Sequence, residues 1–266
     1  MKLQNKVIVV TGAGSGIGSA LVVGLLGREA RVAAVDLRAE SLKSLSADYS
    51  SDRLSIHRVD ISDRKAVEHL PDAIIKHHGA VDAIINCAGI IQPFARINEL
   101  QYEAIERVMN VNFYGTLYMT KAFLPYLLER PEAYIANFSS MGGFLPVPGQ
   151  GVYGASKAAV KLLSESLYAE LLYTNVRVST IFPGATKTNI SGNSGVKMPG
   201  SSMAANEQKF QMLSAEEAAE AVLRGIEQNK PLIFTGKDSN SMNWLYRMNP
   251  VYATKLITKK MKTLLS

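Results

Sequence analysis

The stretch that decides the fold covers residues 6–26 and reads KVIVVTGAGSGIGSALVVGLL. Residues 6–10 are apolar and mostly β-branched, as in a buried strand, and residues 19–26 have the composition of a helix. The turn between them has glycine at every second position from Gly12 to Gly18. Glycine permits a tight turn and close backbone approach, and a helix N-terminus favours an anion. The stretch therefore predicts a cradle for a phosphate or pyrophosphate group.

A second predicted strand, residues 31–36, supports this interpretation because it ends in Asp36. Asp36 follows Gly18 by 18 residues, close to the spacing of about 20 at which a carboxylate binds the adenosine ribose of a dinucleotide. The alternative is a generic strand-to-helix turn with Asp36 as a helix cap. Together the features favour a dinucleotide site. The carboxylate favours NAD over NADP, because it repels a 2′-phosphate, although Arg38 lies near enough to reach one.

A second group of candidate residues lies in the middle of the chain. Tyr153 and Lys157 are one helical turn apart, and Ser140 precedes Tyr153 by 13 residues. A tyrosine hydroxyl has a pKa near ~10, and an ammonium group four residues on is expected to lower that pKa. The serine hydroxyl could hold a substrate oxygen against the tyrosine. The alternatives are a helix-face aromatic, a solvated lysine and a turn serine. The trio predicts proton exchange with an alcohol or carbonyl.

These motifs resemble those of the short-chain dehydrogenase/reductase family. Residues 11–18 match its TGxxxGxG pattern, and residues 183–188 (PGATKT) resemble its PGxxxT segment. Residues 86–89 (NCAG) resemble its NNAG motif, with Cys87 in place of the second Asn. The resemblance extends over about residues 6–235. It implies an α/β fold: a single-domain, Rossmann-type, doubly wound parallel sheet with helices on both faces.

The resemblance also implies which residues form the site. Tyr153 would be the general acid and base, Lys157 would lower its pKa and bind the nicotinamide ribose, and Ser140 would orient the substrate oxygen. Asn112 would help to hold a water that links Lys157 to solvent. The spacing of 13 favours Ser140 over Ser139. The implied cofactor-binding residues are Gly12, Ser15, Gly16, Ile17, Gly18, Asp36, Asp60, Ile61, Asn86, Ala88, Gly89, Tyr153, Lys157, Pro183, Gly184, Thr186 and Thr188. No metal site is expected.

Strand and helix patterns alternate along the rest of the chain, which predicts a parallel sheet. The predicted strands are residues 6–11, 31–36, 54–60, 81–86, 133–138, 176–182 and 231–235. The predicted helices are residues 16–28, 38–48, 63–78, 99–129 (with a break near its start), 151–173 and 214–229. We expect residues 1–238 to form the dinucleotide-binding catalytic domain, with a substrate-loop insert at about 184–213, where Gly, Ser, Asn and Pro are frequent.

Composition narrows the class of protein. The 266 residues suffice for one α/β domain, and the single cysteine, Cys87, forms no disulfide framework and is expected to be a small buried hydrophobe. The first strand begins too early to leave room for a signal peptide, and no apolar run is long enough to span a membrane. These features predict a cytoplasmic protein. Residues 239–266 carry +5 of the net charge of +6, so the main domain offers no surface for nucleic acid.

The residues predicted to line the substrate pocket are mainly apolar: Ile91, Pro93, Phe94, Gly142, Phe144, Leu145, Val147, Val152, Ile190, Met198, Met203 and Phe210. Residues 141–152 contain no cation, and Lys187 is the nearby exception. This lining predicts a lipophilic secondary alcohol or ketone, steroid-like or long-chain, unless these residues pack against a loop or partner subunit. The runner-up is an acyl-chain carbonyl reductase, and a non-catalytic nicotinamide-binding sensor is a further alternative.

Residues 239–266 form a basic, amphipathic C-terminal extension. Its apolar positions fall on one helical face: Tyr252, Leu256, Ile257, Met261, Leu264 and Leu265. Lys255, Lys259 and Lys262 fall on the other. The pattern predicts an ordinary packing helix, or one that covers the substrate entrance or contacts an anionic membrane as a peripheral protein. The family resemblance implies a homodimer or homotetramer assembled through the helices at 99–129 and 151–173.

Overall fold

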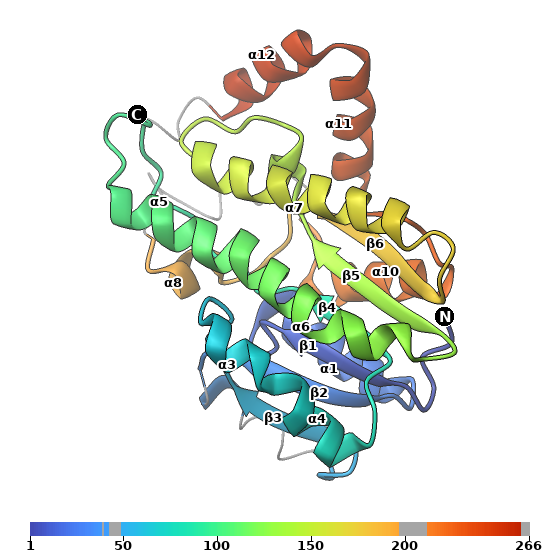
Figure 1. Cartoon of the computed structure of the whole chain (residues 1–266). Helices are drawn as coiled ribbons and strands as arrows, with labels where there is room; N and C mark the ends of the chain where they lie inside the picture. The colour runs from blue at the N-terminus through green and yellow to red at the C-terminus, as the bar shows by residue number, and fades with distance from the viewer. Residues whose placement is uncertain (39, 43–48, 197–211, 262–266) are drawn as a thin grey trace.

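The computed structural model describes all residues except 39, 43–48, 197–211 and 262–266 (Figure 1). Within that part, one sheet of seven parallel strands has the order β3-β2-β1-β4-β5-β6-β7. Its strands are β1 (Val7–Thr11), β2 (Arg31–Asp36), β3 (Leu54–Arg58), β4 (Ala83–Asn86), β5 (Ala133–Phe138), β6 (Val176–Pro183) and β7 (Leu232–Thr235). The order reverses between β1 and β4, where a doubly wound sheet opens a crevice for a ligand. The predicted fold class is confirmed.

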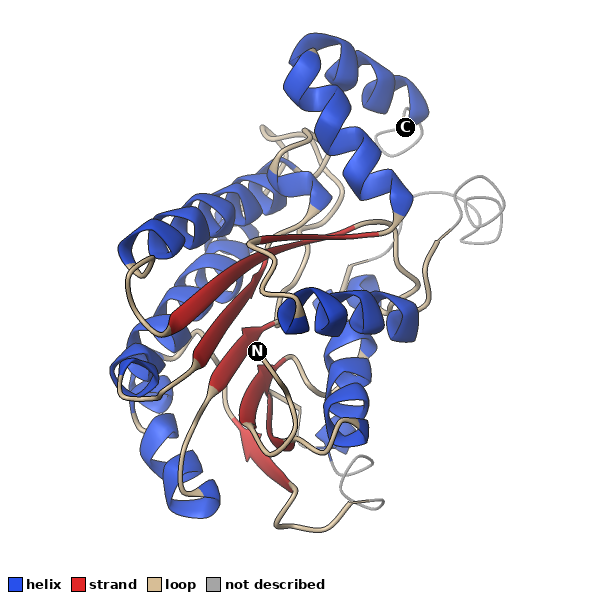
Figure 2. Ribbon diagram, turned by 90° about the vertical axis from the view of Figure 1, so that its right-hand side faces the viewer, coloured by secondary structure: helices blue, strands red, loops and turns tan. Residues whose placement is uncertain are grey.

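Helices cover both faces of the sheet (Figures 1 and 2). One face carries α1 (Gly16–Gly27) and α10 (Ala215–Glu227). The other carries α3 (Arg64–Glu68), α4 (Leu70–His78), α6 (Thr116–Leu128) and α7 (Gly151–Glu170). The remaining helical elements are α5 (Tyr102–Met109), η1 (Asn110–Gly115), η2 (Met141–Gly143), α8 (Ile190–Ser194), α11 (Lys237–Met248) and α12 (Pro250–Lys260).

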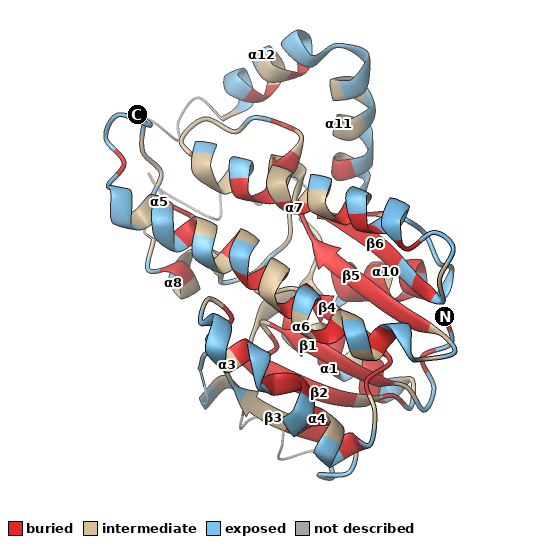
Figure 3. Cartoon of the chain, viewed as in Figure 1, coloured by how far each residue is buried: buried red, intermediate tan, exposed pale blue. Residues whose placement is uncertain are grey.

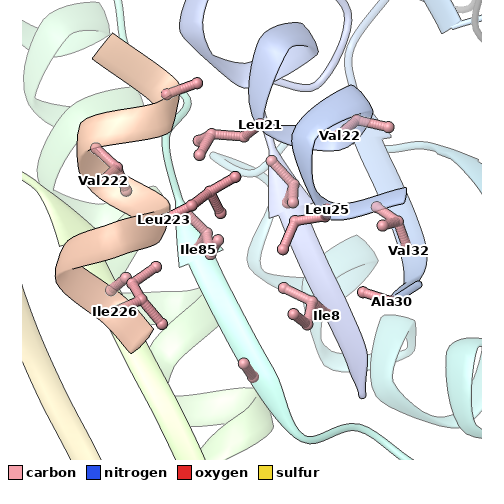
Figure 4. Close-up of a cluster of buried hydrophobic side chains, with 14 of the residues drawn as sticks. Ile8, Leu21, Val22, Leu25, Ala30, Val32, Ile85, Val222, Leu223 and Ile226 are labelled. Atoms are coloured by element: carbon pink, nitrogen blue, oxygen red, sulfur yellow. The ribbon is translucent and has the colours of Figure 1, made fainter. Parts of the chain in front are cut away.

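Burial on both faces explains why the strands are almost wholly apolar. Ile8 and Val10 of β1 point into the cluster under α1 and α10, whereas Val7 and Val9 point into the opposite cluster. Figure 4 shows the first cluster, in which side chains of α1 and α10 meet above the sheet. Each fully buried aliphatic side chain contributes about 1.5–3 kcal/mol. The two clusters therefore hold the carboxyl ends of the strands, and the loops that leave them, in fixed positions.

Two predicted helices differ from the structure. The segment 63–78 forms two helices, α3 and α4, because Pro71 at the start of α4 has no amide proton and its ring excludes the carbonyl group four residues earlier. The segment 99–129 begins as helix only at Tyr102, and a π-helical turn, η1, interrupts it in the middle and not near its start. The helix predicted at 38–48 lies mostly outside the described residues.

The C-terminal segment packs as two helices on the end of the sheet. Residues 237–248 form α11, which was not predicted and begins just before the expected boundary at 239. The buried Ser239 hydroxyl donates to the Phe182 carbonyl at 2.9 Å, which ties α11 to β6. Ala253 and Ile257 of α12 are buried with Leu145. Leu264, Leu265 and Lys262 lie outside the described residues.

Within the described residues, none of the helices combines the length and the apolar character needed to cross a bilayer.

Candidate active site

A cleft of about 440 Å³ opens at the carboxyl ends of the strands, where their order reverses. Its walls come from the β1–α1 turn, the ends of β2 and β4, the start of α7 and the segment after β6. Most of the predicted site residues line it: Gly12, Ser15, Gly16, Ile17, Gly18, Asp36, Asp60, Ile61, Ala88, Gly89, Ser140, Tyr153, Lys157, Pro183, Gly184, Thr186 and Thr188. Two other predicted site residues, Asn86 and Asn112, do not line the cleft and are buried behind its wall.

The glycine turn is shaped by close backbone approach. Gly12 has φ +68°, and a Cβ there would lie 2.8 Å from the Cα of Ala88. A Cβ on Gly18 would lie 2.0 Å from the Gly12 carbonyl oxygen, so neither position tolerates a side chain. Ser15 caps α1 without a side-chain hydrogen bond to the first turn. The amide groups of that turn and the helix dipole are therefore suited to an anion such as a pyrophosphate.

Asp36 is fixed at the end of β2 beside this turn. Its Oδ2 accepts a hydrogen bond from the Gly14 amide at 2.9 Å, and its Oδ1 accepts one from the Arg38 amide, also at 2.9 Å. The Arg38 guanidinium lies 3.7 Å from the carboxylate and donates to the Asn193 side chain at 2.6 Å. A carboxylate held in this way is suited to accept hydrogen bonds from ribose hydroxyls.

Tyr153 and Ser140 form a pair of hydroxyl groups at the cleft. Tyr153 lies in the first turn of α7, and Ser140 follows the end of β5. A Cβ on Gly142 would lie 3.4 Å from the Tyr153 Cε1 and 3.5 Å from the Ser140 Oγ, so both side chains lie beside Gly142. Burial raises the pKa of Tyr153, and the neighbouring Ser140 side chain opposes that rise. A substrate oxygen that meets this pair would therefore meet a neutral phenol and a serine hydroxyl.

Lys157 lies behind the pair, almost completely buried. Its Nζ donates to the Phe138 carbonyl at 2.9 Å. Burial lowers the pKa of Lys157 to about 8. Burial is the largest influence on Tyr153 and raises its pKa, so the lowering by Lys157 that the family resemblance implies stays a prediction.

The π-helical turn η1 places Asn112 behind the cleft wall. Asn112 is fully buried, and its side chain both accepts from the Ile90 amide and donates to the Ile90 carbonyl, each at 2.9 Å. Its Nδ2 also donates to Ser156 of α7 at 3.0 Å. A Cβ on Gly89 would lie 3.1 Å from the Lys157 Nζ and 3.3 Å from the Asn112 Oδ1. Asn112 therefore binds the segment after β4 to α7, close to Lys157.

Two other polar side chains, Asn86 and Ser139, hold neighbouring elements together around the cleft. Asn86 donates to the Asn137 side chain at 2.8 Å and joins β4 to β5 within the core. Ser139, the rejected alternative to Ser140, donates to the Lys157 carbonyl at 2.8 Å and anchors α7. Ser140 instead accepts from the Gly142 amide at 3.0 Å.

Sequence reasoning missed Gln92, which caps α7. Gln92 is buried, and its Oε1 accepts hydrogen bonds from the Val152 and Tyr153 amides at 2.7 and 2.9 Å. Its Nε2 donates to the Gly149 carbonyl at 3.0 Å. Gln150, at the N-cap position itself, makes no side-chain bond to the helix. Because the cap comes from 60 residues away in the chain, no local pattern announces it.

The apolar pocket predicted from sequence is only partly present at the cleft. Of its described members, Ile190 lines the cleft. Gly142 flanks the Tyr153 ring, since a Cβ there would lie 3.4 Å from Cε1. Leu145 is instead buried under α12, and Phe144 packs on Phe182 at a ring distance of 5.7 Å. Met198, Met203 and Phe210 lie outside the described residues.

The cleft also contains residues that were not anticipated there, among them Arg107, Asn193 and Cys87. Arg107 of α5 lines the cleft and donates to the Ser194 carbonyl of α8 at 3.4 Å. Asn193 of α8 donates to the Ser15 hydroxyl at 2.8 Å, so α8 is joined to the glycine turn. Cys87 also lines the cleft, and burial raises the pKa of its thiol to about 12, which leaves the thiol neutral and unreactive.

A doubly wound sheet, a glycine cradle with a nearby carboxylate and a tyrosine–lysine pair in the same cleft define a dinucleotide-binding oxidoreductase. Residues 6–198 match the family described as short chain dehydrogenase. The chain belongs to the short-chain dehydrogenase/reductase family, as its motifs indicated, and is an oxidoreductase that uses a nicotinamide cofactor.

Individual relatives agree with this assignment. A protein of Mycobacterium tuberculosis described as an oxidoreductase, SadH, is 33% identical over 257 residues, which cover 92% of this chain and 91% of that protein. A short-chain dehydrogenase/reductase from Burkholderia phymatum, solved in complex with NAD, has a TM-score of 0.83 at 26% identity, covering 95% and 96% of the two chains. A short chain dehydrogenase from Burkholderia cenocepacia, solved in complex with NADP, has a TM-score of 0.79 at 26% identity, covering 98% and 99%.

Proposed function

We propose that the protein interconverts a lipophilic secondary alcohol and its ketone, with Tyr153 as general acid and base. The observation that carries the proposal is that the side chains of Tyr153 and Ser140 both line the cleft and both lie beside Gly142. Such a pair can bind one substrate oxygen from two sides and exchange a proton with it. A protein that only senses the nicotinamide cofactor would have no use for this pair, so turnover distinguishes the two functions.

The chemistry follows from the placement of these groups. In the oxidation direction, Ser140 orients the substrate oxygen, and the deprotonated, phenolate form of Tyr153 takes the hydroxyl proton as the carbon–hydrogen bond breaks and the carbonyl forms. When bound, the nicotinamide ring supplies the acceptor for the departing hydride. In the reduction direction, Tyr153 returns the proton to the carbonyl oxygen. Because burial raises its pKa, Tyr153 is held as the proton-donating phenol until the pH is high.

NAD is the proposed cofactor, because the Asp36 carboxylate is fixed where an adenosine ribose would lie. A 2′-phosphate there would meet like charge, although Arg38 offers partial compensation. The test is kcat/KM for NAD and for NADP in the native protein and in Asp36→Ser. We expect NAD to be preferred and the preference to shift toward NADP in the variant, with Asp60→Ser as a control of unchanged preference. A lower KM for NADP in the native protein would refute the proposal.

A lipophilic substrate is supported by the neutral surroundings of Tyr153. Residues 141–152 carry no charge, Gly142 flanks the tyrosine ring, and Ile190 lines the cleft. The test is NADH formation from NAD with hydroxysteroids, long-chain secondary alcohols and small sugars. Hydrophobic alcohols should give the highest kcat/KM, and Tyr153→Phe should abolish their turnover. Faster turnover of the sugars would sink this part of the proposal.

Arg107 favours a second candidate, an acyl-chain carbonyl reductase whose substrate carries an anionic group. The Arg107 side chain is exposed at the cleft, where it could meet such a group. For an acyl substrate with a terminal carboxylate, Arg107→Gln should raise KM without lowering kcat. An equal KM in both proteins would leave the neutral alcohol as the favoured substrate.

We also propose how the protein assembles and where it is located. The helices α6 and α7 and the turn η1 expose large apolar side chains, among them Tyr114, Leu128 and Leu162, which supports a homodimer or homotetramer through these elements. A monomeric mass in sedimentation equilibrium would contradict it. We place the protein in the cytoplasm, and cell fractionation tests that placement.

A further inference from the structure

The turn that joins α11 to α12 carries an unusual concentration of exposed apolar side chains. Trp244 and Met248, at the end of α11, are 66% and 69% exposed. Val251 and Tyr252, at the start of α12, are 64% and 55% exposed. These four residues are called the apolar corner below. In Figures 1 and 2 the two helices project from the end of the molecule, so the corner is convex.

The corner is a built surface and not a frayed end. Asn249 caps α12, because its Oδ1 accepts from the Tyr252 amide at 2.9 Å. The Asp238 carboxylate accepts from the Ala185 amide at 2.8 Å and holds the start of α11. The inner face of α12 is already occupied, since Ala253 and Ile257 pack on Leu145. Within the described residues, the four corner side chains lie outside the cluster that holds α12 on Leu145.

Basic side chains surround the corner. Arg247, Lys255 and Lys259 are all exposed, and residues 239–261 contain no aspartate or glutamate. Lys255 lies one helical turn after Val251, and Lys259 lies one turn further, so they continue the same face of α12. Figure 3 shows exposed residues along both α11 and α12. Apolar anchors flanked by exposed cations match the interface of a bilayer that contains anionic lipid.

We propose that the apolar corner docks this protein on an anionic lipid bilayer, with Trp244, Met248, Val251 and Tyr252 in the interface and the cations against the headgroups. A second copy of the chain fits less well, because it would bring equally basic residues against these. A projecting corner also suits a deformable bilayer better than a pocket on a partner protein. Because α12 packs on residues 144–145, docking would bring the substrate side of the protein to the lipid, which suits the lipophilic substrate proposed above.

Trp244 is the single tryptophan of the chain, so its fluorescence reports on the corner directly. We would add vesicles of phosphatidylcholine with phosphatidylserine to the full-length protein, and vesicles of phosphatidylcholine alone in parallel. Docking should shift Trp244 emission to shorter wavelength and cosediment the protein with the anionic vesicles. This readout needs no enzyme activity, so it can fail or succeed independently of the proposed function.

Three variants sharpen the test. Met248→Ser should lower the partition coefficient about tenfold, because it removes one interfacial apolar side chain. Lys255→Gln should lower it about fivefold on anionic vesicles and leave neutral vesicles unaffected. The matched control is Tyr173→Ser, which removes an apolar side chain that is 95% exposed outside the corner and should change nothing.

Three results would overturn the proposal. The first is unshifted Trp244 emission with anionic vesicles. The second is an equal loss of vesicle binding in Tyr173→Ser and Met248→Ser. The third is an emission shift that grows with protein concentration in the absence of lipid, together with a doubled mass that Met248→Ser abolishes. That last result would assign the corner to contact between copies of the chain.

Discussion

Polar side chains are buried at both ends of the parallel sheet, and the two ends use them differently. At the amino end, the Asp82 carboxylate accepts from the Val7 amide and from Arg130 Nε, each at 2.9 Å, and is enclosed by protein. At the carboxyl end, Lys157 is also buried and Tyr153 is half-buried, yet both line the cleft. Buried polar groups that face only protein stabilise the fold, whereas those that also line a cleft are available to a ligand.

A perturbed pKa does not separate the two ends. Burial lowers the pKa of Lys157 at the cleft to about 8, and it lowers the pKa of His78 at the amino end to about 4. His78 bonds to the Ser55 hydroxyl at 2.8 Å, and His57 bonds to the same hydroxyl at 2.8 Å. Neither histidine lines the cleft. Desolvation alone therefore marks burial, and geometry decides which group is a candidate for chemistry.

The largest expected effect comes from removing one hydroxyl at the cleft. Tyr153→Phe should lower kcat/KM by about 10²–10⁴-fold, because the proton donor and acceptor is lost while the ring is kept. NAD affinity, measured by calorimetry, should stay within twofold of the native value (roughly the scatter of small perturbations). Turnover within tenfold of native would remove Tyr153 from the mechanism.

The matched control is a buried tyrosine far from the cleft. Tyr134 hydrogen-bonds Ser179 at 2.6 Å within the core. Tyr134→Phe should leave kcat/KM unchanged and lower the free energy of unfolding by about 1 kcal/mol. Loss of turnover in Tyr134→Phe would show that the assay responds to core damage and not to the cleft hydroxyl.

The converse experiment is made at the amino end. Asp82→Ala removes the acceptor for a backbone amide and for Arg130, so the free energy of unfolding should fall by about 3 kcal/mol, with kcat/KM unchanged. Chemical denaturation measures the loss. The control is Asp72→Ala, whose carboxylate accepts from the Tyr126 hydroxyl on the exposed surface and should contribute less than about 1 kcal/mol. Equal losses of unfolding free energy in Asp82→Ala and Asp72→Ala would show that burial of the Asp82 carboxylate adds no stability.

The glycine turn and Asp36 could be placed together from the sequence, because the signals for them are local. The glycines, Asp36 and the strands around them are read within one β-α-β unit, where backbone sterics dictate residue type. The break at Pro71 is also a local signal, but the prediction of a single helix over 63–78 did not use it. Gln92 and Asn193 were not predictable, because they bond to partners 60 and 178 residues away. Leu145 was misplaced because an apolar residue does not reveal which element will cover it.

Gln92 is buried in the protein like Asp82, but it caps α7, the helix that carries Tyr153. Gln92→Leu leaves the Val152 and Tyr153 amides without their acceptor and should lower kcat about tenfold by letting the tyrosine shift. Gln92→Glu keeps an acceptor at the helix N-terminus and should recover part of the loss.

A helix cap far from the cleft is the control for a purely structural role of Gln92. Ser214 caps α10 through the Glu217 amide at 3.1 Å. Ser214→Ala should lower the free energy of unfolding by about 1 kcal/mol without changing kcat. If Gln92→Leu and Ser214→Ala reduce stability alike and neither changes kcat, Gln92 does not position Tyr153.

The last expected effect is a pH dependence of stability in the acid range, which His78 at the amino end produces. Burial lowers the pKa of His78 from 6.5 to about 4, so below pH 6.5 the unfolded chain binds a proton that the folded chain binds only near pH 4. Stability is therefore complete above pH 6.5 and falls as the pH drops toward 4. We expect Tm, measured by calorimetry, to decline over this window, and His78→Gln to flatten the decline. If the Tm of His78→Gln declines with the same slope, the pH dependence comes from the carboxylates, which also titrate as the protein is acidified.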